Sequence, residues 1–172
     1  MFRIGHGYDL HRLEPYSTWN TSGGGQPLRA LRLGGVAIEH DRGVVAHSDG
    51  DALLHAVTDA LLGAAGLPDL GSSYPDRDPA WAGADSALFL RETAGKIRAA
   101  RWAIENIDAT VILEKPKVAP HKEAIRASIA ALLEIEAARV NVKGKTHEKV
   151  DAVGEGRAIE VHVVALLRYA GP

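Results

Sequence analysis

The spacing of apolar and polar residues predicts both strands and helices along this chain. The clearest strand pattern comes near the end, where apolar residues at Ile159, Val161 and Val163 alternate with polar ones. Apolar stretches rich in glycine or β-branched residues, without helical spacing, predict the other strands. The expected strands cover residues 2–13, 28–38, 103–113, 140–145 and 159–167.

Three helices are predicted by apolar residues spaced three or four positions apart. In the first, Ser48 is the expected N-cap and Asp51 takes the acidic position of a capping box. The second begins at Asp85 or Ser86, and Pro120 lies in the first turn of the third. The apolar faces comprise Leu53, Val57, Leu61 and Ala64; Leu90, Ala94 and Ile97; and Ile125, Ile129 and Leu132.

Strands and helices are interleaved along the chain, which predicts a mixed α/β (α+β) fold in a single domain spanning residues 1–172. The expected architecture is a ferredoxin-like sheet of about four main strands, with helices packed on one face and a small additional hairpin. Residues 16–27 are polar and rich in glycine, so we expect a mobile loop there.

Composition and charge narrow the classes of function. The 172 residues include no cysteine, so disulfides and thiolate metal sites are excluded, and any metal ligands must be histidines or carboxylates. The formal net charge is −2, with no long basic run, which argues against general binding to nucleic acid or to an anionic membrane. No stretch resembles a signal peptide or a membrane span, so we expect a cytoplasmic protein.

One group of residues has the composition of an open zinc site. Asp9 and His11 are two apart on a predicted strand and project to the same face, and His55 adds a ligand from a helix. Each residue alone has a simpler interpretation, as an exposed strand residue or a core histidine. Asp51 and Asp59, four residues before and after His55, are alternatives for a carboxylate that holds its second ring nitrogen, with Asp51 favoured as a helix cap.

Other regions carry groups suited to phosphate or to a nucleobase. His47 and Ser48 stand where the first helix is expected to begin, and the free amides and the helix dipole favour an anion there. After the strand at residues 140–145, Lys and Thr suit phosphate, and Glu148 suits a hard cation such as Mg²⁺. The loop at residues 113–121 can present backbone groups to a planar ring. The ordinary alternatives are a helix cap, a solvated turn and a rigid connector.

Five segments follow one another in a familiar order: RIGHGYDLHRL, AHSDGDALLHAVTDALLGAAGLPDLG, YPDRDPAWAGADS, EKPKVAPH and VNVKGKTHEK. They cover nearly the whole chain and resemble the 2-C-methyl-D-erythritol 2,4-cyclodiphosphate synthase family of the non-mevalonate isoprenoid pathway. The resemblance implies a homotrimer of α/β subunits with active sites between neighbours. It also implies intramolecular cyclisation of 4-diphosphocytidyl-2-C-methyl-D-erythritol 2-phosphate to the 2,4-cyclodiphosphate, with release of CMP.

The resemblance assigns metal-binding roles to individual residues. Asp9, His11 and His55 match zinc ligands. Glu148 matches the ligand of a second divalent cation, Mg²⁺ or Mn²⁺. Independently of the resemblance, the spacing of four residues makes Asp59 the expected carboxylate behind His55, where it would hold the ring nitrogen that faces away from the metal.

The resemblance also implies catalytic and substrate-binding residues. His47 matches a phosphate contact and Thr146 matches a threonine that stabilises the transition state, so both are expected to be catalytic. Residues 113–119 match a cytosine-binding loop. The residues expected to contact substrate are Asp9, Leu10, His11, His47, Ser48, Asp69, Leu70, Gly71, Tyr74, Pro75, Asp76, Arg77, Asp78, Leu113, Glu114, Lys115, Pro116, Lys117, Val118, Ala119, Lys145, Thr146, His147 and Glu148.

The chain departs from many members of that family at a few places. Residues 16–27 are an insertion relative to shorter members, Lys145 and His147 replace threonines, and the turn after Lys149 is shorter. Two other functions stay open. One is a zinc phosphohydrolase, which would release a linear phosphate. The other is a catalytically silent nucleotide- or isoprenoid-binding trimer, which would bind CMP without turnover.

Overall fold

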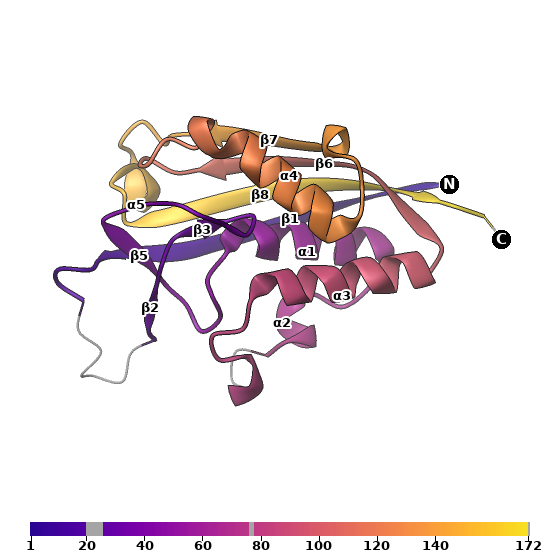
Figure 1. Cartoon of the computed structure of the whole chain (residues 1–172), viewed down its shortest axis with the longest axis horizontal. Helices are drawn as coiled ribbons and strands as arrows, with labels where there is room; N and C mark the ends of the chain where they lie inside the picture. Colours follow the sequence, from indigo (N-terminus) through magenta and orange to yellow (C-terminus); the bar gives the residue numbers. More distant parts are fainter. Residues whose placement is uncertain (20–25, 76–77, 172) are drawn as a thin grey trace.

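The computed structural model describes residues 1–19, 26–75 and 78–171, and its long strands form a mixed sheet (Figure 1). The strands are β1 (Phe2–Pro15), β2 (Leu28–Arg29), β3 (Arg32–Leu33), β4 (Val36–Ala37), β5 (Arg42–Val45), β6 (Trp102–Ile112), β7 (Val140–Lys145) and β8 (Ala158–Tyr169). Within the described ranges, six of them form one sheet in the order β2-β5-β1-β8-β6-β7. β6 and β7 are parallel, and the other neighbouring pairs in the sheet are antiparallel.

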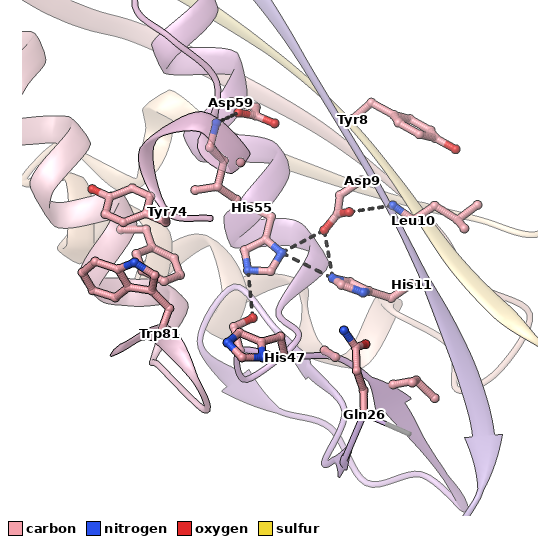
Figure 2. Close-up of a pocket in the computed structure, with 16 residues that line it drawn as sticks. Tyr8, Asp9, Leu10, His11, Gln26, His47, His55, Asp59, Tyr74 and Trp81 are labelled. Carbon is pink, nitrogen blue, oxygen red and sulfur yellow. Dashed lines mark hydrogen bonds and ion pairs between the residues drawn. The ribbon is translucent and has the colours of Figure 1, made fainter. Parts of the chain in front are cut away.

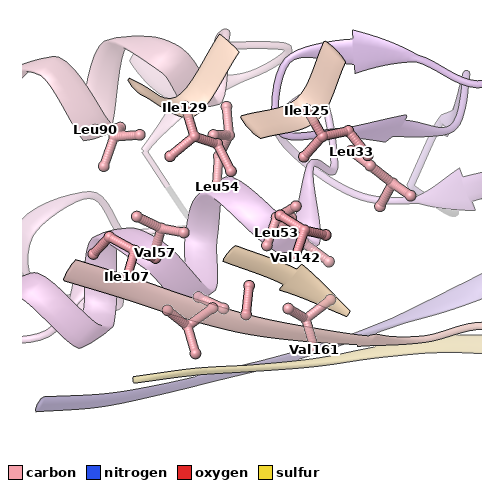
Figure 3. Packing of buried hydrophobic residues seen from close by; sticks show 14 of the residues in the cluster. Leu33, Leu53, Leu54, Val57, Leu90, Ile107, Ile125, Ile129, Val142 and Val161 are labelled. Carbon is pink, nitrogen blue, oxygen red and sulfur yellow. The ribbon is translucent and has the colours of Figure 1, made fainter. Parts of the chain in front are cut away.

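Helices cover one face of this sheet and enclose the core (Figure 3). The helices are α1 (Ala52–Ala65), α2 (Leu70–Ser73), α3 (Ser86–Ala99), α4 (Lys122–Leu133) and α5 (Asp151–Gly154), with 3-10 turns η1 (Pro79–Trp81), η2 (Ala119–His121) and η3 (Ala137–Arg139). α1 packs on β1 and β8, α3 on α1 and β6, and α4 on β7. Fully buried side chains such as Leu53, Ile125 and Val161 join these layers. The predicted apolar helix faces are therefore the core faces.

The sheet departs from the expected ferredoxin-like architecture. That architecture has the order β-α-β-β-α-β, whereas the long elements here follow one another as β1, α1, α3, β6, α4, β7 and β8. The chain leaves β6 and returns through α4 to β7, and such a helical crossover makes the two strands parallel. The short strands β2 and β5 also extend the sheet to six strands in the described residues, rather than about four.

The predicted strand at residues 28–38 is wrong as a single element. Gly34 and Gly35 have φ angles of 62° and 82°, and two successive residues with positive φ form the tight turn of a hairpin. This turn joins β3 to β4, which is the small hairpin that we expected. Half of the predicted mobile loop at residues 16–27, residues 20–25, lies outside the described residues.

The N-cap of α1 is Asp51 and not Ser48, contrary to the sequence prediction. The Asp51 carboxylate accepts the N–H of Leu54 at 3.0 Å, and it also accepts the N–H groups of Gly34 and Gly35 at 2.9 and 2.6 Å. A carboxylate offers more acceptor positions than a hydroxyl. This buried side chain can therefore cap the helix and, at the same time, bind the backbone of the β3–β4 turn. Ser48 lies in the loop before the helix.

α1 lies directly on β1 because two glycines leave room for its backbone. A Cβ atom at Gly5 would come within 2.0 Å of the carbonyl oxygen of Ala60, and one at Gly7 within 1.8 Å of that of Ala56. Alternate residues of a strand share a face, so Asp9 and His11 continue the row that these glycines begin. The close approach of helix and strand therefore brings both side chains towards α1.

The opposite face of the sheet carries exposed apolar side chains. On β1, Ile4 is 72% exposed, and Tyr8 and Leu10 are about half exposed; Val164 of β8 is 36% exposed. Ile4 is the cross-strand partner of Leu166, and Tyr8 is that of His162. We call this surface the open sheet face.

As to membranes, none of the helices in the described residues combines the length and apolar character that a bilayer crossing requires.

Candidate active site

Three candidate metal ligands converge where β1 passes the first turn of α1 (Figure 2). His55 Nδ1 lies 2.9 Å from Asp9 Oδ2 and 3.3 Å from His11 Nε2. Asp9 Oδ2 and His11 Nε2 are 3.1 Å apart. The predicted meeting of these three side chains is therefore confirmed, and their binding of a metal stays a prediction.

The three side chains stabilise one another electrostatically. Burial raises the pKa of Asp9, but hydrogen bonds from His11 and His55, together with their charges, outweigh burial and hold it well below its ordinary value. Burial lowers the pKa of His55, but the hydrogen bond and the charge of Asp9 outweigh that effect and raise it. The electrostatic pairing of Asp9 with His55 therefore favours the charged form of both groups.

The spacing of the ligand atoms fits zinc. Bonds of about 2.0–2.1 Å at tetrahedral angles separate ligand atoms by about 3.3 Å, and the three separations here lie between 2.9 and 3.3 Å. Three protein ligands leave a fourth position for a bound molecule. A pocket of about 380 Å³, which Asp9, His11 and His55 help to line, provides the space for it.

The second ring nitrogen of His55 faces a residue that the sequence analysis missed. Ser86 Oγ lies 2.8 Å from His55 Nε2, and Ser48 Oγ lies 3.4 Å from it. The role predicted for Asp59, to hold this ring, is not what the structure shows, because Asp59 accepts the N–H of Leu70 at 2.7 Å. Ser86 is 31 residues further along the chain than His55, and only the packing of α3 on α1 brings the two together.

His47 and Ser48 line the same pocket, but from a loop. Both precede Asp51, whose carboxylate already accepts an N–H group of the first turn of α1. The premise that the helix begins at His47 and Ser48 is therefore wrong, and their contact with phosphate stays a prediction. His47 Nε2 lies 3.3 Å from the carbonyl oxygen of Asp78. Side-chain donors, and not the helix, are what these residues offer to an anion.

The short helix α2 forms another wall of the pocket. Leu70 and Gly71, both predicted to contact substrate, line it. Asp69 is the N-cap of α2 and accepts the N–H of Ser72 at 2.7 Å. The predicted segment from Asp69 to Gly71 is thus held beside the candidate metal ligands by its own capping interaction.

The predicted contacts at residues 75–78 are only partly within the described structure. Pro75 and Asp78 are described, whereas Asp76 and Arg77 lie outside the described residues. Asp78 caps the turn η1 by accepting the N–H of Ala80 at 2.9 Å. Its backbone carbonyl, rather than its carboxylate, is the group near His47.

An aromatic cluster completes the pocket, and two of its members were not predicted. Tyr74 packs against Phe89, with ring centroids 4.3 Å apart, and against the edge of Trp81 at 5.3 Å. The Tyr74 hydroxyl donates to Glu92 at 2.5 Å, and burial together with this bond raises the pKa of Tyr74. Glu92, which binds this hydroxyl, does not line the pocket. The aromatic rings of Tyr74, Trp81 and Phe89 therefore provide an apolar wall (Figure 2).

A second pocket, of about 240 Å³, lies where the parallel strands β6 and β7 end. It brings the predicted cytosine loop and Thr146 together. Glu114, Lys115 and Pro116 of that loop instead line neighbouring hollows beside His40 and Asp41. The residues that line the second pocket are Leu113, Lys117, Val118, Ala119, Lys122, Gly144, Lys145 and Thr146.

Next to the second pocket, Thr146 and His147 hydrogen-bond to residues close to them in the sequence. The Thr146 hydroxyl donates to Glu148 Oε1 at 2.6 Å, and His147 Nδ1 lies 3.0 Å from Asp151 Oδ2. Glu148 is exposed and has a φ angle of 50°. The second carboxylate oxygen of Glu148, Oε2, is not used by this hydrogen bond.

The two pockets are separate within one chain. The metal-ligand cluster rests on β1, and the second pocket rests on β6 and β7, two to three strands away in the sheet order. At a strand spacing of about 4.8 Å, that is a separation of about 10–14 Å. The register places both at the same end of the sheet, because Asp9 and Val111 pair with the same residue, Val161.

Such a fold, with an Asp–His–His cluster in a polar pocket, defines a candidate metal-dependent enzyme for a small anionic molecule. A sequence model described as the YgbB family matches residues 2–168. The 2-C-methyl-D-erythritol 2,4-cyclodiphosphate synthase of Arabidopsis thaliana, named as chloroplastic, is 54% identical over 166 residues, covering 96% of this chain and 67% of that protein. The chain belongs to the YgbB family and is an enzyme of this synthase class.

Two further comparisons cover nearly the full length of both partners. The synthase of the same name from Chromobacterium violaceum is 52% identical over 170 residues, which is 99% of this chain and all of the relative. The solved structure of IspF from Plasmodium falciparum in complex with CDP has a TM-score of 0.81 and 35% identity, and it covers 99% of this chain and 97% of that one. The family expected from the sequence motifs is thus confirmed.

Proposed function

We propose that this chain converts 4-diphosphocytidyl-2-C-methyl-D-erythritol 2-phosphate to 2-C-methyl-D-erythritol 2,4-cyclodiphosphate and CMP. The observation that carries the proposal is the convergence of Asp9, His11 and His55 in a pocket that also presents His47 and Ser48. The Arabidopsis thaliana and Chromobacterium violaceum relatives carry the name of this synthase. The reaction brings three phosphoryl groups together, so positioning and charge neutralisation are its main requirements.

In this proposal, Asp9, His11 and His55 hold Zn²⁺, and Glu148 holds a second divalent cation, Mg²⁺ or Mn²⁺. When bound, such ions neutralise phosphate charge and polarise phosphoryl oxygens as Lewis acids. One carboxylate and two imidazoles suit zinc. The exposed carboxylate of Glu148 suits a hard cation that keeps several waters and takes its remaining ligands from substrate phosphates.

The chain's own residues position the substrate, which supplies its own nucleophile. An oxygen of the 2-phosphate attacks the β-phosphorus, the bond from that phosphorus to the CMP oxygen breaks, and CMP leaves with the electron pair. His47 and Ser48 donate hydrogen bonds to phosphoryl oxygens, and the α2 wall at Leu70 and Gly71 holds the methylerythritol. Thr146 donates to the negative charge that develops at the attacked phosphorus.

We also propose that three copies assemble so that neighbouring subunits complete each site. The cluster and the second pocket lie on different strands at the same end of the sheet, an arrangement compatible with a site that combines the cluster of one chain with the second pocket of its neighbour. The open sheet face, with Ile4, Tyr8 and Leu10, supports it as well, because exposed apolar surface of this kind favours association. The Plasmodium falciparum relative was solved with CDP, and we expect the cytidine group in the second pocket. A cytoplasmic location stays a prediction.

The test is to follow the reaction by ³¹P NMR with purified protein, Zn²⁺ and Mg²⁺. A cyclic diphosphate together with one CMP per turnover supports the proposal. A linear phosphate would instead identify a zinc phosphohydrolase. Tight CMP binding without any turnover would identify a catalytically silent binding protein. The His55→Ala variant serves as the control, since it removes one proposed ligand and keeps the second pocket intact.

A further inference from the structure

His55 uses both edges of its ring, and only one of them faces the candidate metal ligands. The Nδ1 edge points to Asp9 and His11 (Figure 2). The Nε2 edge points to Ser86, whose Oγ lies 2.8 Å away and whose side chain is fully buried at the first residue of α3. The direction of the hydrogen bond at this second edge decides which ring nitrogen is left with a lone pair.

Asp49 determines the direction of that bond. The Ser86 hydroxyl donates to Asp49 Oδ1, and the Ser86 N–H donates to Asp49 Oδ2 at 3.2 Å. An ionised carboxylate only accepts hydrogen bonds, and a serine hydroxyl has one proton to give. Because that proton goes to Asp49, Ser86 Oγ must accept from His55. His55 therefore carries a proton on Nε2, and in the neutral ring its lone pair is on Nδ1, facing Asp9 and His11.

We propose that Asp49 and Ser86 are positioning residues that orient the His55 ring and fix its tautomer for metal binding. This inference rests on the proposed metal site at Asp9, His11 and His55. A ring nitrogen held by a polar group raises the basicity of the other nitrogen and limits rotation of the ring, and loss of such a partner costs about 10–100-fold in metal affinity. Here the partner is a hydroxyl, and the carboxylate acts through it.

Two other acidic residues near His55, the N-cap Asp51 and Asp59 of α1, do not orient its ring. Asp51 accepts three backbone N–H groups, and Asp59 accepts that of Leu70. Asp49, by contrast, projects from the loop before α1 and meets the N-terminus of α3. The side chain of Asp49 is only 17% exposed, and its Oδ2 lies 4.0 Å from Arg32 Nε. The carboxylate is thus partly shielded from water, which strengthens its hydrogen bonds relative to those of an exposed group.

A purely structural role is the alternative. Asp49 Oδ1 also accepts the N–H of Asp51 at 3.2 Å, so Asp49 and Ser86 join the loop to α3 whether or not they act on His55. In that case their loss would lower stability and leave metal affinity per folded molecule unchanged. Metal affinity and the protonation of the His55 ring therefore separate the two roles, whereas enzyme activity alone does not.

The experiment measures Co²⁺ and Zn²⁺ dissociation constants of the full chain by competition with a chelator. We expect Ser86→Ala to bind both ions about 10–100-fold more weakly than wild type, with altered visible bands for Co²⁺. The matched control is Thr93→Val, which removes another fully buried hydroxyl from α3; it should keep wild-type affinity. Wild-type affinity in Ser86→Ala, or an equal loss in Thr93→Val, would overturn the inference.

Two further measurements decide the matter if Ser86→Ala does not fold. The near-isosteric Asp49→Asn keeps a side-chain oxygen for the backbone N–H groups but loses the charge, and it should also weaken metal binding. In ¹⁵N NMR of the Zn²⁺-loaded wild type, the proton of His55 should be on Nε2; a proton on Nδ1 overturns the inference. If wild type binds neither Co²⁺ nor Zn²⁺, the proposed metal site and the positioning role of Asp49 and Ser86 both fail. If wild type binds the ions and Ser86→Ala binds them equally well, only the positioning role of Asp49 and Ser86 fails.

Discussion

At the scale of single residues, the candidate metal site consists of a few side chains whose charges depend on one another. Asp9 stays ionised at low pH because two imidazoles surround it, and His55 holds a proton more tightly because Asp9 faces it. A metal ion would replace those protons and satisfy the same carboxylate. We therefore expect each of the three side chains to be needed for metal binding, and we expect the packing of the apolar core to be independent of the metal.

We predict that wild type binds about one Zn²⁺ per chain and that His55→Ala binds none. Activity should disappear with the metal, and circular dichroism should show the fold retained, because the buried apolar faces of α1 are unchanged. His121→Ala, a histidine in η2 that is not part of the cluster, is the control and should keep its zinc. Metal analysis that finds stoichiometric zinc in His55→Ala would show that the ligand set is wrong.

Thr146 and His47 are predicted to act mainly on turnover. A donor that acts on developing charge affects kcat more than substrate binding, so Thr146→Ala and His47→Ala should each lower kcat by about 10²-fold or more. Thr146→Ser keeps the hydroxyl that now donates to Glu148 and should retain most activity. Single-turnover rates measured beside thermal melts check this. A destabilised Thr146→Ala with normal kcat per folded molecule would contradict the catalytic role.

At the scale of elements, the site depends on how closely α1 approaches β1. Gly5 and Gly7 permit that approach, and Asp9 and His11 follow on the same face. The motif RIGHGYDLH therefore combines a packing requirement and a ligand pair in one strand. The stability of the α1–β1 contact and the geometry of the metal ligands should respond together to changes at the glycines.

We predict that Gly7→Ala destabilises the protein by about 3 kcal/mol or more and weakens metal binding. Its Cβ would lie 1.8 Å from a backbone oxygen of α1, so the helix must move away. Gly63→Ala on the same helix meets nothing within 4 Å and should stabilise by about 0.5–1 kcal/mol through helix propensity. Denaturant unfolding and metal titration check both variants. A Gly7→Ala variant as stable as wild type would mean that the close approach is not required.

Elements with a regular pattern could be predicted, and contacts between distant elements could not. β7 and α3 follow their apolar spacing. Asp9 and His11 could be paired because alternate strand residues share a face, and His55 could be added because one carboxylate and two imidazoles have the composition of an open zinc site. The cap of α1 was misplaced because Asp51 also binds the Gly34–Gly35 turn, which lies in another part of the chain. Ser86 was missed because nothing local to residues 85–87 indicates that α3 would bring it to His55.

The edge of the sheet at β6 and β7 should contribute a small stabilisation that depends on pH. Burial raises the pKa of Asp108, but hydrogen bonds from Lys143 and Asn141 outweigh it and lower the pKa. A lowered folded-state pKa means that the stabilisation is present above the unfolded value, about pH 3.9, and is lost as the pH falls through the folded value. The side chains of Asp108 and Lys143 are about 40% exposed, so the effect should stay below about 1 kcal/mol.

The measurement is urea unfolding of wild type and Asp108→Asn at a series of pH values. Their difference in free energy of unfolding should be constant between about pH 5 and 8 and should shrink below about pH 4. Comparison of the two proteins cancels the titration of the other carboxylates. A difference that does not change across this range would show that the charge of Asp108 contributes nothing to folding.

At the scale of the whole molecule, the sheet separates two different surfaces. One face carries the helices, the core and the metal-ligand cluster, and the open sheet face carries exposed apolar side chains. The three candidate metal ligands all lie in one chain, so metal binding should not require assembly. Turnover should require it under the proposal that neighbouring subunits complete each site. Assembly and metal binding can therefore be disrupted separately.

We predict that Ile4→Asp disrupts the trimer and abolishes turnover while zinc binding remains. Ile4 is 72% exposed in the isolated chain, opposite Leu166 on the open sheet face, so a charge there would be tolerated by a monomer but would be costly if buried between subunits. Leu88→Asp is the control, since Leu88 is 42% exposed on α3, which lies on the helical side of the sheet. This variant should stay trimeric and active. Light scattering gives the assembly state, and metal analysis gives the zinc content of the same samples. An active wild-type monomer, or an Ile4→Asp variant that remains a trimer, would show that neighbouring chains do not meet through this face to complete the site.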